Sequence, residues 1–277
     1  MQDRYAGDIG DYIKLGLLKA LAPGRKLGVA WYKTPDSNNN DGRHVNYLDE
    51  GSGAAWAYYD PELYAGLRKL VHENRRSVSA LEPLLTGDVR FAADPLVAST
   101  DRSSWFKKIK DGFQDRNLIF VDPDNGIDAS ADGDRKASIK CVTLDEIKRL
   151  SFLRPLIVYH HQTRFKGGHL AEIEHLGQVL QRRGLGCILA LRARSWSPRV
   201  FFIVEATAEI WAAAETFAGR WAPHVTFHAI DGPPDSLGLP PSDPYSVRAE
   251  QTEQEFAERI YAGEFDRLFP NRKNRKS

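Results

Sequence analysis

The chain has 277 residues, 42% of them hydrophobic and 27% charged, so it is long enough to bury a large core as one domain; this composition excludes collagen, coiled-coil and mainly disordered classes. Its 38 Lys and Arg residues are balanced by 37 Asp and Glu residues, and a net charge of +1 excludes global electrostatic attraction to a polyanion. No stretch approaches the roughly 20 apolar residues of a membrane helix, and the N-terminal region has no signal-peptide pattern, so we expect a cytoplasmic protein that does not contact membranes.

Helix-like and strand-like patterns alternate along most of the chain. Helical periodicity is expected over residues 10–21, 60–71, 78–85, 105–113, 143–150, 168–182 and 208–217. Strand-like apolar runs are expected over residues 27–32, 89–92, 117–121, 155–159, 187–191, 200–204 and 225–229. The short connection between the runs 187–191 and 200–204 favours an antiparallel pair. The sequence therefore predicts an α/β fold, a Rossmann-like three-layer sandwich with a mostly parallel sheet and an antiparallel edge strand.

The C-terminal segment has a different character. Residues 232–244 contain five of the 15 prolines and are followed by an isolated helical pattern over residues 252–261 and a basic tail from Arg267 onward. We expect residues 1–231 to form the Rossmann-like domain, and residues 232–277 to pack on that domain or extend from it. The tail is expected either to contact phosphates or to remain solvated.

Three polar loops follow strands of the predicted sheet. They span residues 36–44, 122–128 and 160–164. In an open parallel sheet, ligands bind beyond the carboxyl ends of the strands, where helix N-termini also point. If the three strands are neighbours, the loops converge on one cleft.

The second loop contains the candidate catalytic residues Asp122, Asp124 and Asn125. An apolar strand delivers these side chains into the tight turn Asp-Pro-Asp-Asn-Gly. Carboxylates in this position can bind a divalent cation, accept a proton or orient a substrate amine. The alternative is an Asx-type turn in which Asn125-Gly126 supplies a positive φ and no chemistry.

The third loop begins with His160 and His161, two further candidate catalytic residues. Adjacent side chains of an extended chain point to opposite faces, so only one histidine faces a given site and the other is structural. Metal ligation, base catalysis and phosphate contact are all open to the histidine that faces the site. Nearby Arg164 and Lys166 favour an anionic ligand and are candidate substrate-binding residues.

The first loop combines an Asn triplet with charged residues. Arg43 and His44 are candidate substrate-binding residues, although a solvated turn explains the same composition. The chain has no P-loop, GxSxG, HExxH or CxxC motif. The absence of these motifs reduces the support for several common enzyme classes.

Two short motifs resemble a known family. Residues Ala6, Gly7, Asp8, Asp11 and Lys14 resemble an Ala-Gly-Asn-x-x-Asp-x-x-Lys stretch with one change, and Asp122-Pro123 matches the first half of an Asp-Pro-Pro-Tyr motif. With the order of its elements over residues 5–230, the chain resembles Rossmann-type S-adenosylmethionine-dependent methyltransferases. The nearest are the bacterial enzymes that methylate an adenine N6 in large-subunit ribosomal RNA.

The resemblance implies a cofactor and a role for Asp122. In the family, the aspartate of the Asp-Pro-Pro-Tyr motif accepts a hydrogen bond from the target amine, and the aromatic ring stacks on the flipped base. Here Asp124 and Asn125 replace the second proline and the aromatic residue, and the expected cofactor loop has a single glycine. The residues expected to contact S-adenosylmethionine are Lys14, Asp36, Asn40, Asp41 and Gly42.

Three functions follow as hypotheses. The first is a methyltransferase-like enzyme that acts on an RNA or DNA base. The second is a nuclease or phosphoesterase in which Asp122 and Asp124 hold Mg²⁺ or Mn²⁺, with help from Asp41 and one of the two histidines. The third is a non-catalytic module that binds nucleic acid or protein through residues 192–199 and the basic tail.

Overall fold

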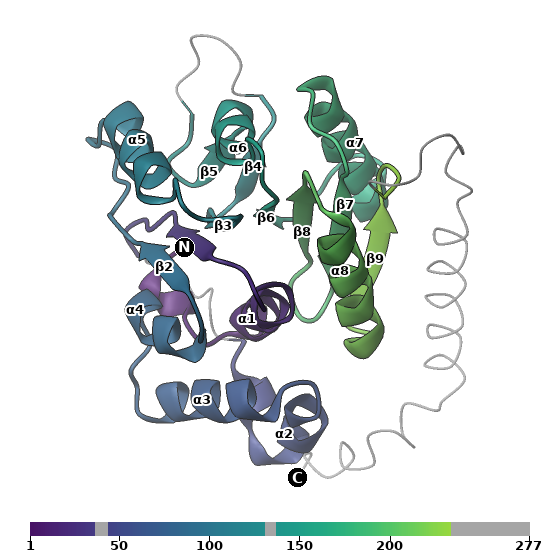
Figure 1. The fold of residues 1–277 in the computed structure, drawn as a ribbon. Helices are drawn as coiled ribbons and strands as arrows, with labels where there is room; N and C mark the ends of the chain where they lie inside the picture. The colour runs from purple at the N-terminus through teal and green to yellow at the C-terminus, as the bar shows by residue number, and fades with distance from the viewer. Residues whose placement is uncertain (37–43, 131–136, 234–277) are drawn as a thin grey trace. The chain divides into compact units, whose positions relative to one another are not determined.

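The protein is built on a mixed seven-stranded sheet in a computed structural model that describes residues 1–36, 44–130 and 137–233 (Figure 1). The strand order is β2-β1-β3-β6-β8-β7-β9. The strands are β1 (Leu27–Trp31), β2 (Val89–Ala92), β3 (Leu118–Asp122), β6 (Leu156–His161), β7 (Leu189–Ala193), β8 (Arg199–Val204) and β9 (Val225–Ala229). Strands β2, β1, β3 and β6 pair in parallel, whereas β8 is antiparallel to both β6 and β7, and β9 is antiparallel to β7.

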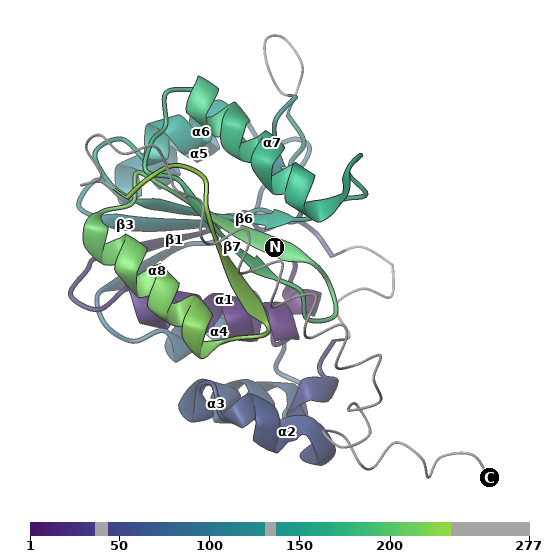
Figure 2. The ribbon, with the colours of Figure 1, turned by 90° about the vertical axis from the view of Figure 1, so that its right-hand side faces the viewer.

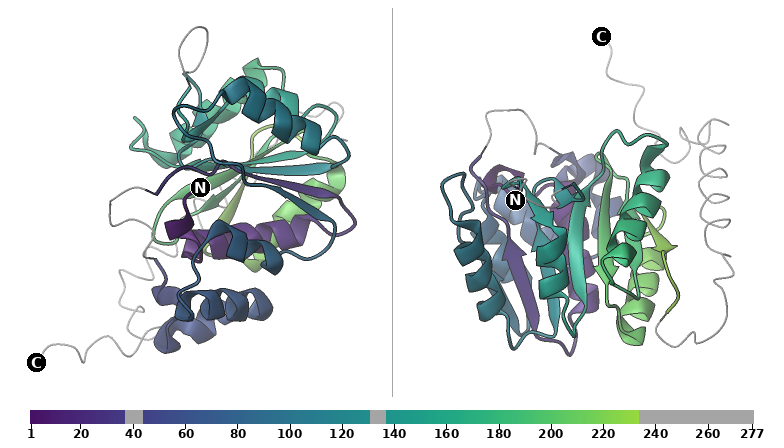
Figure 3. Two further views of the ribbon diagram at one scale, coloured as in Figure 1. Left: turned by 90° about the vertical axis from the view of Figure 1, so that its left-hand side faces the viewer. Right: turned by 90° about the horizontal axis from the view of Figure 1, so that it is seen from above.

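Helices cover both faces of this sheet (Figure 2). One layer contains α5 (Arg102–Gly112), α6 (Leu144–Leu150) and α7 (Gly168–Arg182). The other contains α1 (Ile9–Leu21), α4 (Val78–Leu81) and α8 (Ala208–Arg220), with α2 (Glu50–Ala57) and α3 (Pro61–His72) beyond them. Short 3₁₀ turns lie at Asp3–Tyr5, Asn46–Leu48 and Glu82–Leu84. Figure 3 shows the two layers from the opposite side and confirms the predicted three-layer α/β sandwich.

The central strands are buried on both faces, as their apolar sequences predict. Every residue of β1 and β3 is buried, and alternate side chains enter different cores. Val29 and Phe120 pack in the core of α1 and α8, whereas Ala30 and Val121 pack in the core of α5, α6 and α7. Two independent hydrophobic layers therefore hold the sheet in place.

Several boundaries differ from the sequence prediction. Strand β6 continues through His160 and His161, and the helix expected over residues 78–85 changes to a 3₁₀ turn that contains Pro83. Helix α2 was not expected, because its Gly- and Ser-containing sequence lacks an amphipathic pattern. A small parallel pair, β4 (Gly126–Asp128) with β5 (Cys141–Thr143), was also missed, because three-residue strands carry too short a pattern.

The turn after β3 depends on Gly126. Its φ is +100°, a left-handed conformation that side chains disfavour, and a Cβ atom there would lie 2.6 Å from the His160 Cα atom. The positive φ expected under the alternative Asx-type turn is therefore present at Gly126. Gly126 lets β4 pass close to β6, which fixes the path of the preceding residues Asp122 to Asn125.

The expected C-terminal elements fall outside the described residues. These elements are the linker from residue 234 onward, the helix over residues 252–261 and the basic tail. Within the described part of the chain, no helix is long and apolar enough to cross a membrane.

Candidate functional site

A pocket of about 300 Å³ lies where β3 and β6 end and the antiparallel β8 begins. The N-terminal turn of α1 forms another of its walls. Its lining residues are Met1, Tyr5, Asp8, Gly10, Asp11, Lys14, His44, Asp122, Pro123, Asp124, Asn125, Lys140, Tyr159, His161, Ser197 and Arg199. The pocket therefore occupies the strand ends at which the sequence predicts a ligand site.

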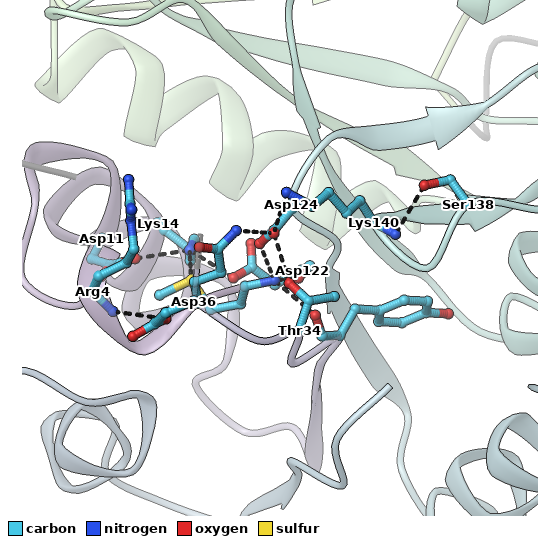
Figure 4. Close-up of polar contacts among 12 residues, drawn as sticks. Arg4, Asp11, Lys14, Thr34, Asp36, Asp122, Asp124, Ser138 and Lys140 are labelled. Atoms are coloured by element: carbon cyan, nitrogen blue, oxygen red, sulfur yellow. Dashed lines mark hydrogen bonds and ion pairs between the residues drawn. The ribbon is translucent and has the colours of Figure 1, made fainter. Parts of the chain in front are cut away.

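At the base of the pocket, Lys14 bridges two carboxylates (Figure 4). Its Nζ atom lies 2.8 Å from Asp11 Oδ1 and 2.8 Å from Asp122 Oδ2. All three side chains are buried. The Asp11–Lys14 pair was expected from the helical spacing, but the contact with Asp122 was not, because it joins α1 to β3 across the fold.

The two carboxylates determine the charge of Lys14. Burial alone lowers the pKa of this amine, but Asp11 and Asp122 outweigh it and raise the pKa above its ordinary value. The Nζ atom also lies 5.6 Å from the ring centroid of Trp31 and 5.4 Å from that of Tyr159. Lys14 is therefore a fixed cation that neutralises part of the acidic cluster and is not a free base.

One carboxylate oxygen of Asp122 accepts a hydrogen bond within the protein, and the other is available to a ligand. Its Oδ2 atom accepts from Lys14, and within the described residues Oδ1 has no hydrogen-bond partner. Because the side chain lines the pocket, Oδ1 can accept a hydrogen bond from a ligand. Asn125, another expected site residue, also lines the pocket, and its backbone N–H donates to the Lys140 carbonyl at 2.8 Å.

Asp124 is committed to internal partners. Its Oδ2 atom accepts from Gln2 Nε2 and from Thr34 Oγ1, each at 2.7 Å, and Oδ1 pairs with the α-amino group of Met1 (Figure 4). Burial opposes ionisation, but the α-amino group and these hydrogen bonds outweigh it and lower the pKa of Asp124. Asp124 thus anchors the first residues of the chain beside the pocket.

The two histidines occupy opposite faces of β6, as the extended geometry predicts. His161 lines the pocket and is exposed. His160 is buried on the other face, where its Nδ1 atom accepts from the Ile127 N–H at 3.1 Å and its Nε2 atom lies 3.4 Å from Glu172 Oε1. His160 therefore links β4 and α7 and has a structural position, whereas His161 remains a candidate site residue.

Of the residues expected to contact a cofactor, Lys14 lines the pocket and Asp36 does not. Asp36 is exposed and accepts a hydrogen bond from the Arg4 N–H at 3.4 Å, outside the pocket lining (Figure 4). Lys14 is engaged by carboxylates, and Asn40, Asp41 and Gly42 lie outside the described residues. Of the described members of this set, only Lys14 therefore belongs to the pocket.

Only some of the expected substrate-binding residues lie at the pocket. His44 lines the pocket, and its carbonyl accepts from the Ile9 N–H at 3.0 Å. Arg164 and Lys166 are exposed and do not contribute to the pocket, while Arg43 lies outside the described residues. The polar loop after β6 therefore adds only His161 to the site.

Sequence reasoning did not place Asp8, Tyr159 or Arg199 in the site. Asp8 caps α1, since its side chain accepts from the Asp11 N–H at 3.1 Å. Arg199 pairs with His161 across the strands, and the two side chains share one face of the sheet. A charged residue at the first position of an apolar strand was the available signal for Arg199, because burying that charge requires a reason.

Two of the three arginines in the candidate binding segment at residues 192–199 are not on the surface. Arg192 and Arg199 are both buried, at 8% and 3% exposure. Each belongs to a strand, on opposite faces of the sheet, and Arg192 donates from Nε to Gln162 Oε1 at 3.3 Å. Trp196 is half exposed and packs on Trp56, with ring centroids 5.5 Å apart. The arginines are inside because β7 and β8 extend further than the sequence suggested.

The carboxylates do not form a metal site in the described part of the chain. Asp122 Oδ2 and both oxygens of Asp124 already have cationic or hydrogen-bonding partners. Among these residues, no group of three or more His, Cys, Asp or Glu side chains is arranged to hold a metal ion. The geometry therefore gives no support to ligation by Asp122 and Asp124 together.

Comparison with known proteins adds no relative. The chain matches no protein-family model, and a search of curated proteins finds none that is significantly similar. Function therefore has to be argued from the pocket itself.

Proposed function

We propose that the chain is a methyltransferase-like enzyme that acts on an amine of an RNA or DNA base, with the Asp122 pocket as the acceptor site. The observation that carries this proposal is the half-occupied carboxylate of Asp122, with Oδ2 held by Lys14 and Oδ1 without a partner among the described residues. An exocyclic amine carries an N–H group that donates a hydrogen bond to such an oxygen. The same contact orients the nitrogen lone pair for attack.

Lys14 is a positioning residue in this proposal. By holding Oδ2 at 2.8 Å, it fixes the orientation of the Asp122 carboxylate. The acceptor oxygen is therefore preorganised before substrate arrives, which reduces the cost of orienting the amine. Asn125, at the same pocket wall, offers an amide that can donate to or accept from the edge of a base.

The order of the elements supports the same reaction class. The resemblance implies a first strand, then a strand that ends in Asp-Pro, then a strand pair followed by a helix. The chain has β1, then β3 ending at Asp122, then β7 and β8 followed by α8. S-adenosylmethionine, when bound, supplies an electrophilic methyl group. Of the described residues expected to contact it, only Lys14 belongs to the pocket, so we assign roles only to the acceptor side.

The metal-dependent alternative is not favoured. It requires Asp122 and Asp124 to face one ion, but Asp124 is turned toward Gln2 and Thr34 while Asp122 is paired with Lys14. A cation there would have to displace these partners. No observation in the described residues favours that arrangement over an amine at Asp122.

The proposal is tested by titrating S-adenosylmethionine into the protein and by measuring transfer of a labelled methyl group to single-stranded RNA and DNA. Asp122→Asn is expected to reduce transfer about 100-fold, because the amide cannot keep the same orientation and charge. The matched control is Asp94→Asn, which changes another Asp-Pro pair at a half-exposed position where Asp94 bonds to Lys108 at 2.6 Å. It should leave the rate unchanged.

Circular dichroism of both variants separates lost activity from lost folding. A wild-type protein that neither binds S-adenosylmethionine nor transfers methyl groups would overturn the proposal. An Asp122→Asn variant that is folded and fully active would exclude the role given to Asp122.

A further inference from the structure

The guanidinium group of Arg199 is buried, and the Asp8 carboxylate is the acid that acts on it electrostatically. The side chain is 3% exposed, and its Nε and Nη1 atoms have no hydrogen-bond partner in the described part of the chain. Among the described residues Arg199 forms no direct ion pair, since the Asp8 carboxylate acts on it without a salt-bridge contact. An unpaired buried charge costs roughly several kcal/mol of stability. A protein therefore retains such a charge where a bound ligand completes its interactions.

The same group lies against the first turn of α1. A Cβ atom on Gly10 would come within 2.3 Å of Arg199 Nη1, so the absence of a side chain at Gly10 makes room for the guanidinium. Helix α1 is 13 residues long, and its N-terminal end carries a partial positive charge. Arg199 and the dipole of α1 therefore present positive potential to one end of the pocket, although the Ile9 and Asp11 N–H groups of this turn already donate to the His44 carbonyl and to Asp8.

The acidic groups of the pocket do not cancel this potential. Lys14 lies between Asp11 and Asp122, and Lys140 Nζ lies 3.9 Å from Asp124 Oδ2. Burial and then the Asp11 carboxylate raise the pKa of Asp8, the acid next to Gly10, although Arg199 acts in the opposite direction.

The size of the pocket limits the ligand. At about 300 Å³ it is at the small end of ligand sites and suits one nucleotide unit, not a duplex. A base that reaches Asp122 would then be out of its stack, which is the arrangement used by enzymes that modify bases. Its phosphate needs several donors, because a phosphate has more acceptor oxygens than a carboxylate.

We propose that Arg199 and the N-terminus of α1 form a phosphate subsite that holds the phosphate of the nucleotide unit whose amine lies at Asp122. The inference rests on the proposed function for the identity of the base, and it adds the anionic group that the enzyme recognises. A nucleic-acid backbone and a free nucleotide share this phosphate chemistry. The experiment therefore includes both sources.

Binding is measured with the full chain by calorimetry and by thermal unfolding. The probes are inorganic phosphate, acetate, adenosine, adenosine 5′-monophosphate and a single-stranded oligonucleotide. Phosphate is expected to raise the Tm of the wild type, because a ligand that binds only the folded state stabilises it. The monophosphate should bind at least tenfold more tightly than adenosine. Tighter binding of the oligonucleotide than of the monophosphate would identify the backbone as the source.

Arg199→Met tests the subsite with a stability readout that a structural role would not produce. The variant should lose the phosphate-dependent rise in Tm. Without ligand it should be no less stable than the wild type, because methionine removes an unpaired buried charge and retains apolar volume. Arg90→Met is the matched control, since Arg90 is exposed and paired with Asp115 outside the pocket, and it should bind phosphate normally.

Gly10→Ala provides a second variant if Arg199→Met does not fold. Its methyl group displaces the guanidinium while Arg199 is retained, so phosphate affinity should fall about tenfold or more. Acetate that binds as tightly as phosphate, or phosphate binding unchanged in both variants, would overturn the subsite. Arg199-dependent phosphate binding without methyl transfer would leave the subsite standing and exclude the proposed reaction. If Arg199→Met transfers methyl groups with the wild-type KM, the proposed reaction stands and the phosphate subsite is excluded.

Discussion

Lys14 and Asp122 are 108 residues apart in the sequence, yet they form a buried ion pair with 2.8 Å between Nζ and Oδ2. The pair connects the first helix to the end of a central strand and lies beneath the pocket. Asp11, one turn before Lys14, completes a cluster with two carboxylates and one amine. The stability of this cluster and the shape of the pocket therefore depend on the same three side chains.

Replacement of Lys14 by methionine should strongly destabilise the protein. The change leaves Asp11 and Asp122 buried without their cation, and removal of one partner from a buried pair costs about 3–5 kcal/mol. Urea denaturation measures the loss. The double variant Lys14→Met/Asp122→Asn should recover part of it, because one of the two orphaned charges is then absent.

The control for this change is Lys69→Met. Lys69 is exposed and lies 4.0 Å from Glu73, so its loss should have no measurable effect on the free energy of unfolding. Equal stability of the Lys14 and Lys69 variants would show that the cluster contributes nothing.

Asp8→Asn should make the stability of the protein less sensitive to rising pH. Burial and the neighbouring Asp11 raise the pKa of Asp8 in the folded protein, so the folded state binds this proton more tightly than the unfolded state. The stability associated with that proton is fully present below the unfolded pKa and is lost as the pH rises through the folded pKa. Asparagine does not ionise, and it still caps the helix.

The pH dependence is measured by urea denaturation in phosphate-free buffers. The free energy of unfolding of Asp8→Asn, relative to wild type, should increase with pH. Asp101→Asn is the matched control, because Asp101 caps α5 and hydrogen bonds from Ser104 and Ser103 lower its pKa. Its relative stability should change in the opposite direction, with the wild-type advantage lost as the pH falls. Identical profiles for wild type and Asp8→Asn would contradict the assignment.

The two histidines should respond differently to truncation. His160→Ala removes the acceptor of the Ile127 N–H and the partner of Glu172, and an unsatisfied buried group costs about 1–3 kcal/mol. His161→Ala changes an exposed residue, so its stability should stay within about 0.5 kcal/mol of the wild type. Chemical denaturation measures both values.

A ligand titration completes this comparison. His161→Ala should weaken binding of adenosine 5′-monophosphate, because His161 lines the pocket beside Arg199. If His160→Ala weakens ligand binding and leaves stability unchanged, the two positions have been assigned to the wrong faces.

Most of the fold could be predicted, because its signals are local. The buried strands β1 and β3 are continuous apolar runs, and the capping box of Thr143 and Glu146 begins α6 as expected. Helix α2 and the short β4–β5 pair could not be predicted, because neither has enough residues or a clear enough period.

The candidate site was predictable only in part. The strand-end position of Asp122, Asn125 and His161 was visible in the sequence, since a polar residue after an apolar run marks a strand end. The exclusion of Asp36, Arg164 and Lys166 from the pocket was not visible, because loop direction depends on contacts made after the strands assemble. The position of Arg199 required the pairing of β8 with β6.

The sequence by itself determined most of the helices and strands, and that His160 and His161 face opposite ways, because periods of two and 3.6 residues are properties of neighbouring residues. Only the tertiary structure decided which charges from distant segments meet. Lys14 reaches Asp122, and Arg199 reaches Gly10, because the strand order places distant segments side by side. Such pairings depend on the free energy of the whole packed sheet, which no local pattern encodes.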